Sequence, residues 1–240
     1  MLTDHLQANR HIVKQAQADA DTLIVSTALD FAKNQQTVEV IANDTDILVM
    51  LLYHWQDDMA NIFIHKVTGG ARRKLVGPST IHSIQDVSSK VHPVIKNNIL
   101  FIHAWSGCDT TSSTFEHSKT KLMKDLEKDH SIQEIAGNFC LADTQDKFGE
   151  LGIDFFTLLF GKACKERTLT TIRFHKYQTM IAQSNILEPQ RMPPTIRAAH
   201  FHSLRVFLQV NQWMNLDTEV LDPCSWGWQL GNVVVLDLNR

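Results

Sequence analysis

The sequence has 240 residues, of which 43% are hydrophobic and 20% are charged, with a formal net charge of -3. This is enough material for one good hydrophobic core, or for one core with a small helical appendage. The charge balance excludes the broad electrostatic attraction to nucleic acid that a strongly basic protein has, so we expect any nucleic-acid contact to be local.

The cysteines, the first residues and the apolar runs indicate the cellular compartment of the protein. The four cysteines are far apart and include no C-x-x-C pair, which argues against a structural zinc site and fits free thiols in a reducing compartment. The first ten residues lack an apolar signal-peptide core, and the longest apolar run, Ile47 to Tyr53, is too short to span a bilayer. We expect an intracellular protein, nuclear or cytoplasmic, that is not secreted and has no membrane partner.

Helix and strand patterns alternate at the start of the chain. Residues 4–17 and 21–33 predict two helices, the second with a clear apolar face. Residues 37–43 are rich in β-branched side chains and predict a strand in the middle of a parallel sheet that is covered on both faces. An apolar helix over 47–54 follows, with Thr45 or Asp46 as its cap.

The alternation continues to about residue 110. Residues 61–67 and 72–76 predict two strands joined by a turn at Gly69-Gly70. Residues 79–88 and 97–105 predict two helices, and Gly107 ends the second.

The second half of the chain reads as mostly helical. Residues 120–180 and 195–213 have helical patterns, separated by a boundary at Pro193-Pro194, and 226–238 predict a short hairpin with a turn at Gly231-Asn232. This order predicts an α/β core followed by an α-helical half. We place the two domains at 1–115 and 116–240.

Three acidic clusters lie at boundaries between the predicted elements. In open α/β sheets, ligands bind beyond the carboxyl ends of the strands, and one cluster follows the predicted central strand. Helix N-termini favour carboxylates, and another cluster opens a helix. Acidic oxygen donors without a nearby Cys or His pattern favour Mg²⁺ or Mn²⁺. The clustered residues are Asp19, Asp21, Asp44, Asp46 and Asp109.

This pattern has a chemical use and also a simpler explanation. Two divalent ions about 4 Å apart activate water and stabilise the leaving oxygen in phosphodiester cleavage. Taken alone, each Asp-x-Asp pair is better explained as a turn with a helix cap. The order of all three clusters favours the metal site.

The same motifs resemble a known family. Residues 19–22, 43–48 and 106–109 resemble the acidic helix start, the strand-end Asp-x-Asp and the Gly-x-Asp of flap endonucleases and XPG-type nucleases. The match is closer to a group of PIN-like, flap-endonuclease-related proteins, found in many animal genomes and often linked to transposable elements. The stretch Gly107-Cys108-Asp109-Thr110-Thr111-Ser112 is its most specific motif.

The C-terminal half carries two further marks of that group. Pro193-Pro194-Thr195 and Trp226-Gly227-Trp228 are similar to its C-terminal motifs, so the resemblance covers roughly residues 15–238. The resemblance implies a PIN-like Rossmannoid core with a central, mostly parallel sheet. It also implies that the five aspartates hold the metals and form the catalytic site of a DNA or RNA nuclease.

This sequence departs from the family's pattern in two places. The family uses acidic residues upstream of Asp19 that this sequence does not contain, so we expect an N-terminally incomplete core and include a truncated or inactive nuclease in the prediction. Relatives carry a basic Gly-Lys-Gly-Lys-like loop after the Thr-Thr-Ser stretch. Here that place reads Glu116-His117-Ser118-Lys119, without the glycines that let a backbone approach phosphate.

Basic side chains supply the predicted nucleic-acid contacts. In the family, the region after the Asp109 motif contacts the DNA backbone, and lysines there neutralise phosphates. Interleaved acidic residues make a solvated helix face the alternative for the lysines, and a charge-protected edge strand is the alternative for the arginines. The residues are Lys119, Lys121, Lys124, Arg72 and Arg73.

Two rival functions stay open beside the nuclease. One is a catalytically dead module that binds nucleic acid without cleaving it. The other is an interaction or scaffold protein of transposon origin, in which the carboxylates bind a structural ion or nothing.

Overall fold

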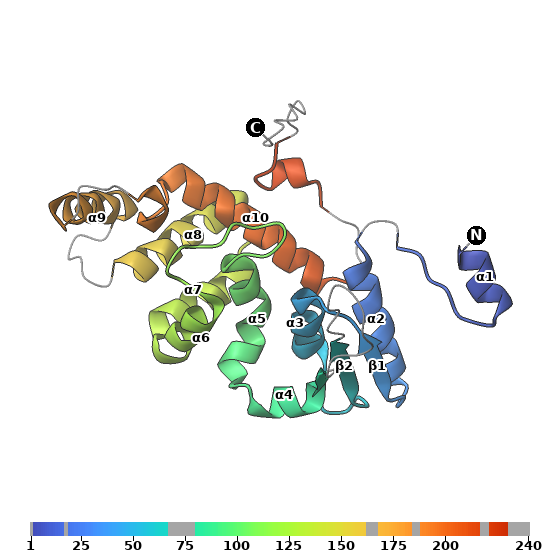
Figure 1. The fold of residues 1–240 in the computed structure, drawn as a ribbon. Helices are drawn as coiled ribbons and strands as arrows, with labels where there is room; N and C mark the ends of the chain where they lie inside the picture. The colour runs from blue at the N-terminus through green and yellow to red at the C-terminus, as the bar shows by residue number, and fades with distance from the viewer. Residues whose placement is uncertain are drawn as a thin grey trace, which may run out of the picture. The chain divides into compact units, whose positions relative to one another are not determined.

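The chain forms two compact units, Met1–Ser89 and Lys90–Arg240. We describe them from a computed structural model that covers residues 2–16, 19–66, 80–161, 168–183, 188–216 and 221–229 (Figure 1). The predicted strand at 72–76 and the predicted turns at Gly69-Gly70 and Gly231-Asn232 lie outside these residues. No helix in the described part of the chain is both long enough and apolar enough to cross a membrane.

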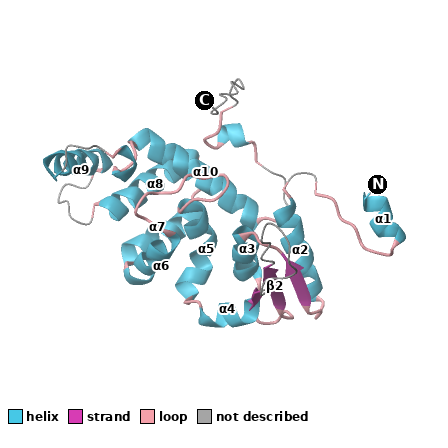
Figure 2. Cartoon of the chain, viewed as in Figure 1, coloured by secondary structure: helices cyan, strands magenta, loops and turns pink. Residues whose placement is uncertain are grey.

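The first unit combines helices with a small sheet (Figure 2). Its helix at the N-terminus ends at Ala8, well before the predicted end at residue 17, because the backbone turns at Arg10 with a φ of 62°. The elements are α1 (Leu2–Ala8), α2 (Ala20–Lys33), β1 (Val38–Ile41), α3 (Thr45–His54), β2 (Ile62–Lys66), β3 (Thr80–Ser83) and α4 (Ile84–Lys90).

The sheet differs from the predicted central, mostly parallel one. Its order is β1-β2-β3, with β1 parallel to β2 and β2 antiparallel to β3. The expectation of a PIN-like Rossmannoid sheet is therefore wrong: the described sheet is small and mixed, and helices dominate the chain. The prediction of one helix over 79–88 is also wrong, since residues 80–83 pair with β2 before α4 begins.

One face of the sheet is buried and the other is not. Val40, Ile62 and Ile64 are buried, whereas Ile41 is 70% exposed and Ile81 is 55% exposed. Strand residues alternate between the two faces, so the exposed pair lies opposite the buried set. A parallel sheet in the middle of an α/β core is covered on both faces, and this one is not.

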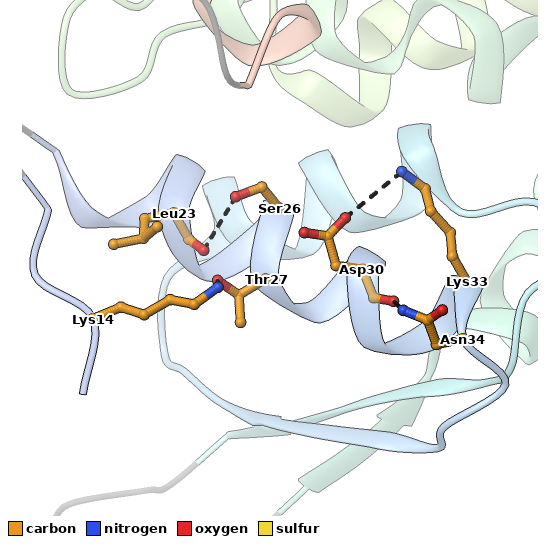
Figure 3. Close-up of polar contacts among 7 residues, drawn as sticks. All are labelled: Lys14, Leu23, Ser26, Thr27, Asp30, Lys33 and Asn34. Atoms are coloured by element: carbon orange, nitrogen blue, oxygen red, sulfur yellow. Dashed lines mark hydrogen bonds and ion pairs between the residues drawn. The ribbon is translucent and has the colours of Figure 1, made fainter. Parts of the chain in front are cut away.

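Helix α2 shows how the first unit holds its shape. Its inner face buries Val25, Leu29 and Ala32. On the outer face, the Lys14 ammonium donates to the Thr27 hydroxyl at 2.9 Å, which ties the segment before the helix to it (Figure 3). At its C-terminal end the Asn34 amide donates to the Asp30 carbonyl at 2.8 Å.

The second unit is helical in its described part, which confirms the helical pattern predicted after residue 120. Thr195 caps its longest helix, which begins one residue after the start predicted at Thr195. The elements are α5 (Pro93–Trp105), α6 (Lys119–Lys128), α7 (His130–Leu141), α8 (Gln145–Phe160), α9 (Leu169–Gln183), η1 (Pro189–Arg191), α10 (Ile196–Met214) and η2 (Pro223–Ser225).

An aromatic core surrounds Trp105, which is fully buried. Its ring lies 4.6 Å from that of Phe155, 4.8 Å from Phe156 and 4.9 Å from His202, measured between centroids. Helix α10 packs against both α5 and α8. Gly152 permits the close approach of α8, because a Cβ at this position would meet the Ser203 hydroxyl of α10 at 1.5 Å.

Candidate functional site

The two Asp-x-Asp pairs of the first unit form matching helix starts. Asp19 is the N-cap of α2, and its carboxylate accepts the Asp21 amide at 3.3 Å. Asp44 is the N-cap of α3, in place of the predicted Thr45 or Asp46, and accepts the Asp46 amide at 2.9 Å. The first aspartate of each pair is exposed and the second is half-buried. We call these four carboxylates the acidic helix starts.

Chain order places the acidic helix starts at one end of the first unit. Strand β1 runs back from the C-terminal end of α2, and α3 begins just beyond the end of β1. Helices α2 and α3 also pack on each other. Their N-termini therefore lie toward the carboxyl end of β1, the edge at which ligands of α/β sheets bind.

The local role of these carboxylates is helix capping. An aspartate at an N-cap satisfies an amide that has no partner within the helix, and both amides and dipole favour its charge. Among the described residues, no group of three or more His, Cys, Asp or Glu side chains is arranged to hold a metal ion. The carboxylates are nonetheless hard oxygen donors of the kind that Mg²⁺ and Mn²⁺ prefer.

Asp109, the fifth predicted ligand, belongs to the second unit. It sits in a loop whose other motif residues have structural contacts. Gly107 has a φ of 107°, and a Cβ there would meet the Ser113 backbone at 2.8 Å. The Thr111 hydroxyl binds the Ala104 carbonyl, and the Thr110 hydroxyl donates to Gln209 of α10 at 2.5 Å.

The Asp109 side chain itself is exposed. The Gly-Cys-Asp-Thr-Thr motif thus builds a fixed loop that presents one carboxylate to solvent. A left-handed backbone angle explains the glycine, because other residues rarely adopt it.

The predicted nucleic-acid contacts have mixed surroundings. The Lys119 ammonium donates to Nδ1 of His103 at 2.9 Å, and that of Lys121 donates to the Glu116 carbonyl at 3.0 Å, so both bind within their own unit. Lys124 is exposed. Arg72 and Arg73 lie outside the described residues.

Structural contacts hold the segment Glu116 to Lys119, which follows the Asp109 loop. Glu116 takes a φ of 63°, a conformation that glycine adopts easily. His117 is buried with its ring 4.5 Å from that of Phe160, and the Ser118 hydroxyl caps α6. These contacts fix the loop against the helices.

A groove in the second unit was not anticipated from the sequence. It has a volume of about 540 Å³ and lies between the loop after Asp109, α9 and the start of α10. We call it the α9–α10 groove. The lining residues that matter for its chemistry are Ser112, Phe115, Arg173, Ala198, His202 and Arg205.

Backbone carbonyls hold the two arginines of the groove. Arg173 donates to the Pro193 carbonyl. Arg205 donates through Nε to the Gly227 carbonyl at 2.8 Å, and its guanidinium lies 5.0 Å from the centre of the Trp228 ring. Each guanidinium has five N–H donors, so one such bond leaves most of its donors for another partner.

His202 forms part of the groove wall and is neutral at pH 7. Its Nε2 lies 3.2 Å from the Trp105 carbonyl, which can only accept, so Nε2 carries the proton. Burial lowers the pKa of His202 to about 4; the bond to Trp105 opposes this and Arg205 adds to it. The neutral ring therefore leaves Nδ1 as a hydrogen-bond acceptor.

Sequence patterns gave only a faint signal for this groove. His202 and Arg205 are three residues apart and so share a face of α10. Ser112, Arg173 and Ala198 join them only through tertiary packing.

Comparison of the chain with protein-family models, with curated proteins and with solved structures finds no match.

Proposed function

We propose that this chain is a divalent-metal-dependent, nuclease-like protein that acts on phosphodiesters of DNA or RNA. One observation carries the proposal: two Asp-x-Asp helix starts with the same capping pattern lie toward the same end of the first unit, beyond the carboxyl end of β1. The motif resemblance to PIN-like, flap-endonuclease-related proteins adds support. The mixed sheet does not weaken it, since function depends on sites rather than folds.

The acidic helix starts fit Mg²⁺ or Mn²⁺ by donor chemistry. In each N-cap aspartate one oxygen accepts an amide, which leaves the other oxygen of Asp19 and Asp44 for a cation. The helix N-termini offset part of the repulsion among the carboxylates. When bound, a divalent ion supplies an activated water and charge stabilisation for the leaving oxygen. The role of Asp109 as a further ligand stays an implication of the resemblance.

Substitutions at Asp44 separate metal binding from helix capping. Asn caps helices as well as Asp does, whereas Ala does not. We expect Asp44→Asn to keep the stability of the protein and to abolish Mn²⁺-dependent cleavage of a branched or single-stranded oligonucleotide. We expect Asp44→Ala to abolish cleavage and also to cost about 1 kcal/mol of stability. Cleavage that persists in Asp44→Asn at the wild-type rate contradicts the proposal.

A second function is nucleic-acid binding without cleavage. It is supported by the exposed Lys124 in the stretch predicted to contact nucleic acid. If this function is correct, the wild-type protein retains oligonucleotides in a gel-shift assay but leaves them intact with Mg²⁺ or Mn²⁺. Loss of both binding and cleavage favours a scaffold role.

A further inference from the structure

We infer that the α9–α10 groove binds a nucleoside monophosphate unit, that is, a phosphate monoester next to a flat ring. This site is separate from the acidic helix starts and does not depend on the proposed cleavage. The inference rests on the charge of the groove, the arrangement of its donors and the nature of its walls.

The charge of the groove is positive. Arg173 and Arg205 both line it, and none of the described residues that line it is acidic. Two acidic side chains on flanking segments are engaged by other cations. Glu116 lies 3.8 Å from Arg191 and 4.0 Å from Lys176, and Glu188 also pairs with Arg191. These two acidic side chains therefore pair with cations other than the two groove arginines.

The donors are held in place before a ligand arrives. A backbone carbonyl holds the Arg173 guanidinium, so this side chain loses little conformational entropy on binding. Arg205 lines the groove too, and its guanidinium contacts Gly227 and Trp228, which lie outside the lining. Guanidinium N–H groups match phosphate oxygens in pairs. The first turn of α10 contributes Ala198 to the lining, and the helix dipole favours negative charge there. The Ser112 hydroxyl supplies a further polar group at the lining.

The remaining walls suit a ring. Phe115 is 43% exposed, and Phe201 and Pro193 also line the groove. Aromatic side chains stack on bases of any sequence. The neutral ring of His202 also lines the groove. A volume of about 540 Å³ is within the usual range for small-molecule sites.

Thymidine 5′-monophosphate is the probe for this site, measured by isothermal titration calorimetry on the full chain in EDTA. EDTA removes divalent cations, so the result is independent of the acidic helix starts. We expect binding of the monophosphate, and at least about tenfold weaker binding of thymidine and of inorganic phosphate, because each lacks half of the recognised chemistry. No binding at millimolar concentration, or equal binding of inorganic phosphate, overturns the inference.

Variants at Ala198 change the charge of the groove without removing a contact. Ala198 is the third residue of α10, and Thr195 is its N-cap, so Glu or Gln at this position completes a capping box. We expect Ala198→Glu to bind the monophosphate at least about tenfold more weakly than Ala198→Gln, the neutral variant of matched size. Equal affinities of the two variants overturn the inference.

A pair of variants on α9 distinguishes a specific contact from general charge. We expect Arg173→Gln to weaken binding about tenfold, and Lys176→Gln, one turn along the same helix and outside the groove lining, to have little effect. Equal losses overturn the site. A 5′-phosphorylated oligothymidylate distinguishes the two possible sources of the ligand, a strand end and a free nucleotide. Tighter binding of a 5′-phosphorylated strand than of the free monophosphate supports a strand end, and the reverse order supports a free nucleotide.

Discussion

At the scale of single residues, His202 is the clearest case of chemistry set by burial. It is nine-tenths buried, and desolvation lowers its pKa from the ordinary 6.5 to about 4. Between these two values the unfolded chain binds a proton that the folded chain does not. Stability that is present above pH 6.5 is therefore lost as the pH falls toward 4.

The size of this effect is measurable. A shift of this extent corresponds to about 3 kcal/mol of unfolding free energy across the window. We expect His202→Gln, which retains a donor for the Trp105 carbonyl, to flatten the dependence of stability on pH between 4 and 6.5. Urea denaturation at several pH values measures it. His175→Gln on the exposed face of α9 is the control and keeps the wild-type slope.

At the scale of elements, a glycine between two packed helices leads to a prediction about stability. Gly152 lies where α8 crosses α10, and an added Cβ would meet the buried Ser203. We expect Gly152→Ala to destabilise the protein by roughly 1–3 kcal/mol, because the two helices must move apart. The midpoint of urea unfolding measures the loss.

Gly137 provides the matched control in α7. An added Cβ there meets nothing within 4 Å, and the position is exposed. Alanine in a helix interior is favoured over glycine, so we expect Gly137→Ala to stabilise the protein by about 0.5–1 kcal/mol. If both variants change stability in the same direction, close packing of α8 on α10 is not what selects Gly152.

The sequence predicted those elements that local chemistry determines. Helix α2 has an aspartate cap and an amphipathic face, and both were legible before the structure. Strand β3 could not be predicted in this way, because its four residues form a strand only by pairing with β2. Glu39 lies in the predicted central strand and is exposed. A charged residue at this position already indicated that one face of the sheet is not covered, contrary to the expectation of a sheet covered on both faces.

Of the two candidate sites, one could be predicted from local sequence and the other depends on tertiary packing. The acidic helix starts follow from two short motifs and could be predicted with their helices. The α9–α10 groove could not, since Ser112, Arg173 and Ala198 are distant in sequence and meet only when α9 and α10 pack. Trp226 packs on Phe207, with ring centroids 4.3 Å apart, which is also a contact between segments distant in sequence.

At the scale of the whole molecule, the chain has two compact units with different chemistry. The first carries the acidic helix starts, and the second carries the Asp109 loop and the positive groove. An acidic region suits a cation and a positive groove suits an anion, so each unit carries its own proposal and each can be tested by itself.

The most direct test of the central claim is a calorimetric titration of Mn²⁺ into the full chain. We expect the wild-type protein to bind Mn²⁺, and the double variant Asp44→Asn with Asp46→Asn to lose that binding while its thermal unfolding midpoint stays within a few degrees of wild type. Equal Mn²⁺ binding by the two proteins would show that the acidic helix starts are caps alone and would contradict the account.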